Sequence, residues 1–228
     1  MKPTEILDRA KAPDGASLVL SRRDGEYLLA LDGQTLMASR QRGSEQVLAR
    51  RAASALAGRA SPRVLVGGLG FGYTLRAALD ALPAGARLVL CELFAFLLEA
   101  HRGEVGNLAG RPLEDPRVEA VNADVATLLG GPERFDAILL DVDNGPWAFT
   151  MPANEKLYSP AGLARISRSL APGGLLAVWS AEPSPEFEKR LRKAGFRVKS
   201  ERVEARSGAP GGRHTLFFAT PSRPPLGT

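Results

Sequence analysis

The sequence predicts an α/β protein with a doubly wound, mostly parallel sheet of seven strands, and two observations support this prediction. After about residue 60, short apolar runs alternate with helical patterns, which is the order of a parallel sheet with helices on both faces. The last two apolar runs are joined by the Gly-rich stretch 208–212 instead of a helix. We therefore expect an antiparallel hairpin to close the sheet.

The individual elements follow from hydrophobic periodicity. Strands are expected at 63–66, 87–91, 118–122, 137–140, 175–179, 197–204 and 215–219. Helical patterns between the first five strands lie at 74–82, 95–108, 125–129 and 161–170. Ahead of them, runs at 17–20, 26–31 and 34–39 are separated by Asp-Gly turn signals and predict a small antiparallel meander. We expect three segments: the meander with a linking helix (1–60), the main domain (61–220) and a disordered tail (221–228).

Composition excludes several classes of protein. The chain has 228 residues, 44% hydrophobic and 24% charged, as in an ordinary globular domain, and its single cysteine forms neither an internal disulfide nor a thiolate metal site. The first 17 residues hold no apolar segment long enough for a signal peptide or membrane span, so we expect a cytoplasmic protein without a membrane partner. The net charge is +5, but the basic residues lie on helix faces without interleaved aromatic residues, so no nucleic-acid partner is expected.

A glycine-rich turn follows the first strand of the expected sheet. In VLVGGLGFGYTLRAAL, residues 64–79, an apolar strand passes through this turn into a helix. Gly68, Gly70 and Gly72 lie in the turn, where missing side chains let backbone amides approach a ligand at the helix N-terminus. Dinucleotide-binding proteins use nearly the same turn, so it does not identify the ligand by itself.

Acidic residues follow the next two strands. Glu92 ends the second strand, where a carboxylate can accept hydrogen bonds from both ribose hydroxyls of a nucleoside. Asp124 lies just after the third strand, in place to accept from an adenine amino group. An Asp at this position can also cap the helix that follows it, and this alternative stays open. Together with the glycine turn, the two residues predict a pocket for one adenosine and a short tail.

The fourth strand delivers two further carboxylates, Asp141 and Asp143, to the same edge of the sheet. Such groups can orient or deprotonate an attacking amine, or hold a cation. No histidine is near them in sequence, so we expect no metal site.

The sequence also predicts the positions of two acceptor-site candidates and of both histidines. Trp147 follows a Gly-Pro turn and is a candidate lid over the substrate, and Glu182, after the fifth strand, is a candidate contact of the acceptor. His101 is expected on a helix surface and His214 at a loop edge. We therefore expect no histidine-based mechanism.

Six motifs between residues 30 and 180 share their order with one family: LDG (31–33), SRQRGSEQ (39–46), TLR (74–76), DPRV (115–118), LLDVD (139–143) and LAPGG (170–174). In these motifs the chain resembles the spermidine synthase family of aminopropyltransferases, which has the class I AdoMet-dependent methyltransferase fold, a Rossmann-like doubly wound sheet. The resemblance implies nucleoside contacts at Gln46, Glu92 and Asp124, a catalytic carboxylate at Asp141, and an acceptor region that includes Tyr158. It also implies AdoMet or decarboxylated AdoMet as the cofactor, a small-molecule acceptor such as an amine, and a homodimer contact through the meander.

The chain departs from the family pattern at four places. Phe71 stands where the family has an Asp that holds the ammonium group of decarboxylated AdoMet. The segment DVDNGP is two residues shorter than the family's loop after the catalytic Asp. Leu163 matches a Tyr of the family's amine channel, and Glu45 matches a Tyr that precedes the nucleoside-binding Gln. These changes remove amine-handling residues and keep the nucleoside pocket.

We therefore expect an enzyme, an AdoMet-type transferase. Because of Phe71, the main hypothesis is methyl transfer from intact AdoMet to a small-molecule acceptor. The alternative is aminopropyl transfer from decarboxylated AdoMet to a polyamine, in which Asp141 orients or deprotonates the amine. A second alternative is a nucleoside-binding or interaction protein without catalysis, since a fold does not by itself imply an activity.

Overall fold

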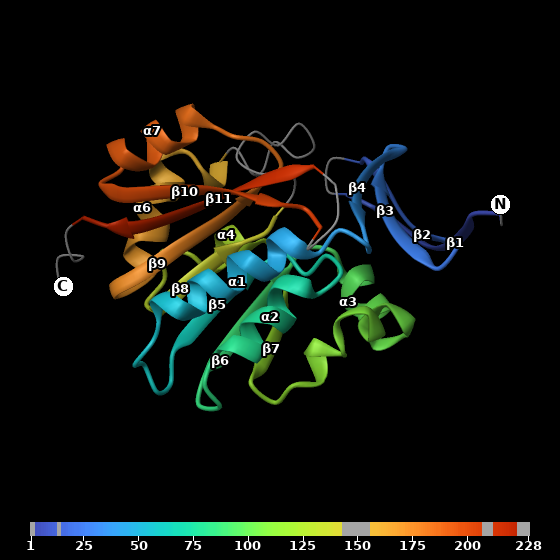
Figure 1. Ribbon diagram of the computed structural model, residues 1–228, viewed down its shortest axis with the longest axis horizontal. Helices are drawn as coiled ribbons and strands as arrows, with labels where there is room; N and C mark the ends of the chain where they lie inside the picture. The colour runs from blue at the N-terminus through green and yellow to red at the C-terminus, as the bar shows by residue number, and fades with distance from the viewer. Residues whose placement is uncertain (1–2, 13–14, 143–155, 207–211, 223–228) are drawn as a thin grey trace.

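Two sheets build the molecule (Figure 1). The computed structural model describes residues 3–12, 15–142, 156–206 and 212–222. The first sheet is an antiparallel meander in chain order, made of β1 (Glu5–Lys11), β2 (Ser17–Arg23), β3 (Glu26–Leu31) and β4 (Gln34–Ala38). Its two tight turns place Asp24, Gly25, Asp32 and Gly33 at positive φ, as the Asp-Gly signals require.

The second sheet has seven strands in the order β10-β11-β9-β8-β5-β6-β7 and confirms the expected fold class. Its parallel strands are β5 (Arg63–Gly67), β6 (Arg87–Glu92), β7 (Val118–Asn122), β8 (Phe135–Leu140) and β9 (Leu170–Ser180). β11 (Arg213–Pro221) pairs antiparallel with both β9 and β10 (Phe196–Glu204), so the closing hairpin is confirmed.

Helices cover both faces of the main sheet. α1 (Gly43–Ala55) and α2 (Tyr73–Ala81) pack on one face, in front of the sheet in Figure 1, and share a core that includes Leu48 and Leu79. α4 (Val125–Leu128), α6 (Pro160–Ser169) and α7 (Pro185–Lys193) pack on the other face. Among the described residues, no helix is long and apolar enough to cross a membrane.

The helical pattern expected over 95–108 is divided in the structure. α3 (Ala95–Arg102) ends at Gly103, and 3-10 helices follow at Glu104–Ala109 and Pro112–Glu114. At Gly103 the backbone leaves helical geometry, with ψ −141°. The expectation of one continuous helix was therefore wrong.

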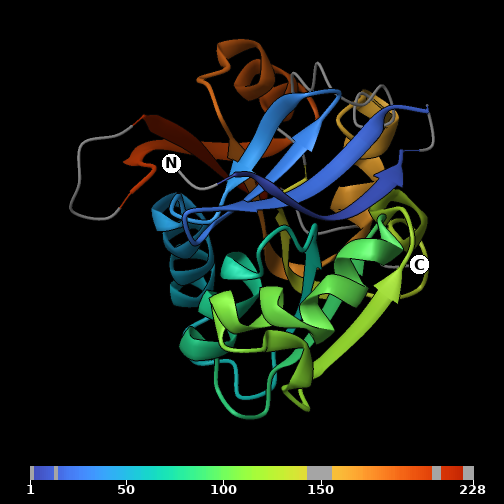
Figure 2. The same cartoon turned by 90° about the vertical axis from the view of Figure 1, so that its right-hand side faces the viewer.

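The meander packs over the glycine turn and α3. Leu18, Leu20 and Leu29 of the meander share a buried cluster with Phe71 of the glycine turn and Leu97 of α3. Figure 2 shows the four meander strands crossing in front of the main sheet. This packing places the apolar face of the meander opposite the C-terminal ends of the parallel strands of the main sheet.

Candidate functional site

A cavity of about 320 Å³ lies between the meander and this edge of the main sheet. The meander and the segment that follows it contribute a wall that is largely apolar, with Leu18, Leu29, Leu31, Leu36, Met37 and Gln41. The opposite wall is polar and comes from the strand ends and α1, with Glu45, Glu92, Asp124, Asp141, Trp179 and His214. The cavity therefore has one apolar and one acidic side.

The glycine turn forms part of the cavity wall under tight steric limits. A Cβ atom at Gly68, which has φ +89°, would lie 2.3 Å from the carbonyl oxygen of Asp141. At Gly70 it would lie 2.6 Å from Cε of Met37. Gly72 is not among the lining residues and packs instead against His101. Of the three predicted glycines, the structure therefore brings Gly68 and Gly70 to the cavity.

Glu92 ties the glycine turn to the end of β6. Its Oε2 accepts from the backbone N–H of Leu69 at 2.7 Å, and its Oε1 accepts from that of Phe94 at 2.8 Å. Burial raises the pKa of Glu92 despite these hydrogen bonds. Each carboxylate oxygen has a second lone pair, so the cavity-facing side of Glu92 can still accept from hydroxyl groups.

Asp124 lines the cavity and also caps α4. Its Oδ1 accepts from the backbone N–H of Ala126 at 2.8 Å. The capping role is thus present in the structure, and it occupies one carboxylate oxygen. A ligand contact through the other oxygen is compatible with it.

A pair of carboxyl groups forms the centre of the acidic wall. Asp141 follows β8, and its Oδ2 accepts from Thr74 Oγ1 at 2.5 Å. Glu45, in the first turn of α1, is only 5% exposed. Burial and then the nearby Asp141 charge raise the pKa of Glu45 to about 8, and burial raises the pKa of Asp141 to about 6. The pair can therefore hold and release a proton near neutral pH, as general acid–base chemistry requires.

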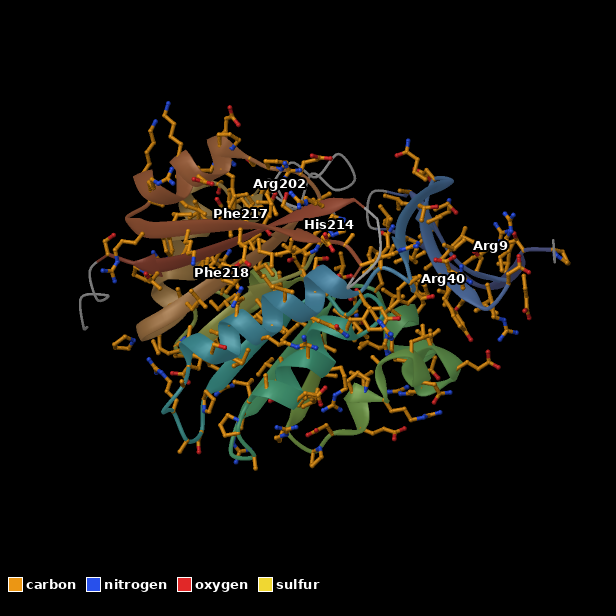
Figure 3. The ribbon with its side chains drawn as sticks, viewed as in Figure 1. Arg9, Arg40, Arg202, His214, Phe217 and Phe218 are labelled. Carbon is orange, nitrogen blue, oxygen red and sulfur yellow. The ribbon has the colours of Figure 1, made fainter. Side chains whose placement is uncertain are left out.

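Ser44, Trp179 and His214 surround the Glu45 carboxyl group. Ser44 Oγ lies 2.6 Å from Glu45 Oε2 and 2.8 Å from His214 Nδ1, and it accepts from Trp179 Nε1 at 3.0 Å. The rings of Trp179 and His214 meet edge to face, with centroids 4.6 Å apart. Figure 3 shows His214 at the end of β11 nearer the meander.

Three predicted contacts lie elsewhere. Gln46 lines a separate surface hollow with Arg76 and is not among the residues that line the cavity. Tyr158 is fully buried and packs edge to face on Phe187, 5.1 Å away, so it lies in the core instead of the cavity. Glu182 is exposed and is not among the lining residues. The structure therefore brings none of these three side chains to the cavity wall.

Two predicted residues, Asp143 and Trp147, lie outside the described residues. The prediction for His101 was wrong, whereas His214 lies at the start of β11, beside the preceding loop, as expected. His101 is buried, with Nε2 3.0 Å from the carbonyl oxygen of Gly70, and His214 lines the cavity. β11 has no alternation of exposed and buried positions that could have indicated its orientation, and no local sequence pattern pairs His214 with α1.

Phe71 does not face the cavity. It is 1% exposed, and its ring packs 6.5 Å from that of Tyr73 within the cluster beneath the meander. The missing Asp at this position therefore does not leave the cavity without acid, because Glu45 supplies a second carboxyl group from α1.

Comparisons with known proteins agree with this architecture. No protein-family model matches the chain. The polyamine aminopropyltransferases of Mycobacterium tuberculosis and Mycobacterium bovis are 30% identical to it over 193 residues, which cover 79% of this chain and 35% of those proteins. The chain thus spans about a third of the length of these curated relatives.

Solved structures show the same fold. Spermidine synthase from Thermotoga maritima superposes with a TM-score of 0.74 at 20% identity, over 96% of this chain and 74% of that one. A spermidine synthase in complex with the transition state analogue AdoDATO gives 0.72 at 20% identity, over 96% and 73% of the two chains. A probable spermidine synthase from Corynebacterium glutamicum gives 0.63 at 14% identity, over 98% and 81%. The resemblance to the spermidine synthase family is confirmed.

The expectation of methyl transfer was wrong. The relatives and solved structures described above are aminopropyltransferases and spermidine synthases, which favours the alternative hypothesis. The error came from Phe71, which we took for a replaced ligand contact although it is a core residue under the meander.

Proposed function

Because the chain is spermidine synthase-like in sequence and in fold, we propose that it transfers the aminopropyl group of decarboxylated AdoMet to a primary amine of a polyamine. The charge of the cavity wall carries this proposal. In a chain of net charge +5, the described lining residues include four carboxyl groups and neither Lys nor Arg. Both substrates of aminopropyl transfer are cations without a carboxylate, whereas intact AdoMet would bring a carboxylate into a wall with no described Lys or Arg to pair with it.

The nucleoside part of the donor fits the glycine-turn side of the cavity. Glu92 would accept from the ribose hydroxyls and Asp124 from the adenine amino group, each through lone pairs that the backbone hydrogen bonds leave free. The sulfonium would then lie towards Asp141, whose negative charge favours a cation there.

Asp141 is the residue that we assign to the transfer step. Its carboxylate takes a proton from the acceptor ammonium, and the freed nitrogen lone pair attacks the methylene carbon bonded to the sulfonium. The new C–N bond forms as the C–S bond breaks, and the bonding electron pair stays on sulfur in methylthioadenosine. Thr74 holds Asp141 Oδ2, which fixes the carboxylate for this proton transfer.

The test incubates the full chain with decarboxylated AdoMet and an amine such as 1,4-diaminobutane or spermidine, and detects methylthioadenosine and the aminopropylated amine by mass spectrometry. Asp141→Asn should lower kcat by about 10²–10⁴-fold, because it removes the base. Donor affinity, measured by calorimetry, should change far less, since the nucleoside contacts remain.

Asp80→Asn is the matched control, because Asp80 pairs with Arg76 on the outer side of α2. It should leave both quantities unchanged. Tight donor binding without methylthioadenosine formation from any amine would contradict aminopropyl transfer. Tighter binding of intact AdoMet than of the decarboxylated form would contradict the charge argument.

Two further proposals concern the setting of the reaction. The free, buried thiol of Cys91 supports a reducing compartment, and we place the reaction in the cytoplasm.

β1 is a largely exposed edge strand of the meander, which supports a homodimer contact there. Light scattering on the purified chain tests the second proposal.

A further inference from the structure

Ser44 has a complete and unusual set of hydrogen-bond partners. Its Oγ lies within 3.0 Å of Trp179 Nε1, 2.8 Å of His214 Nδ1 and 2.6 Å of Glu45 Oε2. A hydroxyl group has one proton and two lone pairs, so three partners saturate it. The indole N–H can only donate, and it therefore occupies one lone pair permanently.

The remaining proton and lone pair of Ser44 can serve Glu45 and His214 in two ways. When Glu45 is ionised, Ser44 donates to it, and the free lone pair accepts from a His214 that carries its proton on Nδ1. When Glu45 is protonated, it donates to Ser44, which in turn donates to an unprotonated Nδ1. The two arrangements differ only in the positions of protons along the same hydrogen bonds.

We propose that Glu45, Ser44 and His214 form a proton relay that connects the acidic centre of the cavity with its rim. The role of the relay is to remove the proton that the acceptor amine loses, and this role rests on the proposed function. His214 is half-buried, beside the exposed Glu182, whereas Glu45 and Ser44 are buried. The three groups thus lead from the interior to the surface.

The proton balance gives each group a step. The transfer reaction releases one proton for each C–N bond formed, and Asp141 receives it. It passes to Glu45, and Glu45 then donates to Ser44 while Ser44 donates to Nδ1 of a neutral His214. The resulting imidazolium releases a proton from Nε2 to solvent. Proton exchange with solvent, which removes the proton from Nδ1 and adds one to Nε2, then returns His214 to the Nε2–H tautomer.

Charged groups on the neighbouring elements act on both ends of the relay. Asp141 after β8 raises the pKa of Glu45, which favours the protonated arrangement near neutral pH. Glu182 favours the imidazolium of His214, whereas burial lowers the pKa of that ring. Tyr73 on α2 and Arg42 at the start of α1 also interact with this group of charges.

The test is to follow the histidine tautomers by ¹⁵N NMR in the full, ligand-free chain from about pH 5 to about pH 10. The chain has only two histidines, so two sets of imidazole signals are expected. Neutral His214 should change from the Nε2–H to the Nδ1–H tautomer as Glu45 ionises. His101 should keep one tautomer, because its Nε2 is bonded to the Gly70 carbonyl.

Three variants separate the relay from general effects. Glu45→Gln and Ser44→Ala should each abolish the pH-dependent tautomer change of His214. Ser169→Ala, which removes a buried serine hydroxyl on the opposite face of the sheet, should leave it intact. In the transfer assay, Ser44→Ala should lower kcat by about 10²-fold with little change in KM.

The outcomes distinguish the relay from the proposed function. A single His214 tautomer over the whole pH range would overturn the relay, even if the chain transfers aminopropyl groups. The tautomer change in a chain without transfer activity would support the relay and overturn the proposed function. If Ser44→Ala does not fold, Glu45→Gln gives the same decision, because it removes the ionisation that drives the change.

Discussion

At the scale of single residues, the carboxyl groups of the cavity have structural roles as well as ligand-facing ones. Glu92 holds the backbone of the glycine turn, and Asp124 caps α4. A simple alanine substitution at either residue therefore changes the shape of the site together with its chemistry. Variants that keep the backbone hydrogen bond are needed to measure the ligand contact alone.

Asp124 offers such a pair of variants. Asn is as good an N-cap as Asp, so Asp124→Asn should leave the thermal stability nearly unchanged, whereas Asp124→Ala should cost about 1 kcal/mol, or about 2–4 °C in Tm. If Asp124 accepts from the adenine amino group, both variants should weaken methylthioadenosine binding by about tenfold, as measured by calorimetry. Full affinity in Asp124→Asn would leave capping as the only role of this residue.

The glycine turn and the strand-end acids were predictable because each follows an apolar run directly. Parallel strands end at one edge, so Gly68, Glu92, Asp124 and Asp141 had to meet there. Ser44 and His214 are 170 positions apart, and only the packing of α1 against β9, β10 and β11 brings them together. No local pattern contains that contact.

At the scale of elements, ten of the eleven described strands were predicted from the sequence, and β1 was missed. β5 and β8 are mostly apolar, and all but one residue of each strand is buried. β1 has no buried residue and no alternating pattern, so its place in the meander depends on backbone pairing with β2. A strand of this kind is not visible in side-chain periodicity.

α3 and the glycine turn are linked by His101, and this link makes the turn sensitive to acid. As a neutral ring, His101 donates from Nε2 to the Gly70 carbonyl, while its buried Nδ1 has no hydrogen-bond partner among the described residues. Burial lowers its pKa. Below about pH 6.5 the unfolded chain takes up a proton at His101 that the folded chain resists, so stability is lost as the pH falls.

We predict that the wild type loses more of its free energy of unfolding than His101→Leu between about pH 7.5 and about pH 5, because only the wild type carries the buried imidazole. Urea denaturation at each pH measures this difference, in which the titration of the other acids largely cancels. Parallel pH profiles for wild type and His101→Leu would show that protonation of His101 has no effect on stability.

At the scale of the whole molecule, two sheets of different character enclose the cavity. The main sheet presents carboxyl groups at its edge, and the meander presents Leu and Met side chains across the cavity. The acidic side suits the reacting ammonium and the sulfonium, and the apolar side suits the methylene groups of an amine. Among the described lining residues, none on the meander is charged, so a second ammonium group would find no acid there.

This division predicts a weak preference for diamines over monoamines and a way to increase it. Leu36 is a partly buried lining residue of β4, so Leu36→Glu places a carboxylate opposite the acidic wall. The variant should raise the kcat/KM ratio of 1,4-diaminobutane to butylamine by about tenfold, equivalent to about 1.4 kcal/mol. Ile6→Glu adds the same charge to the meander at an exposed position outside the cavity and should leave the ratio unchanged.

An equal increase in both variants would mean that the net charge of the meander attracts the diamine. No increase in Leu36→Glu would place the second ammonium elsewhere. A specific increase would show that the acceptor lies between the two sheets, with its reacting amine at Asp141 and its other end against the meander.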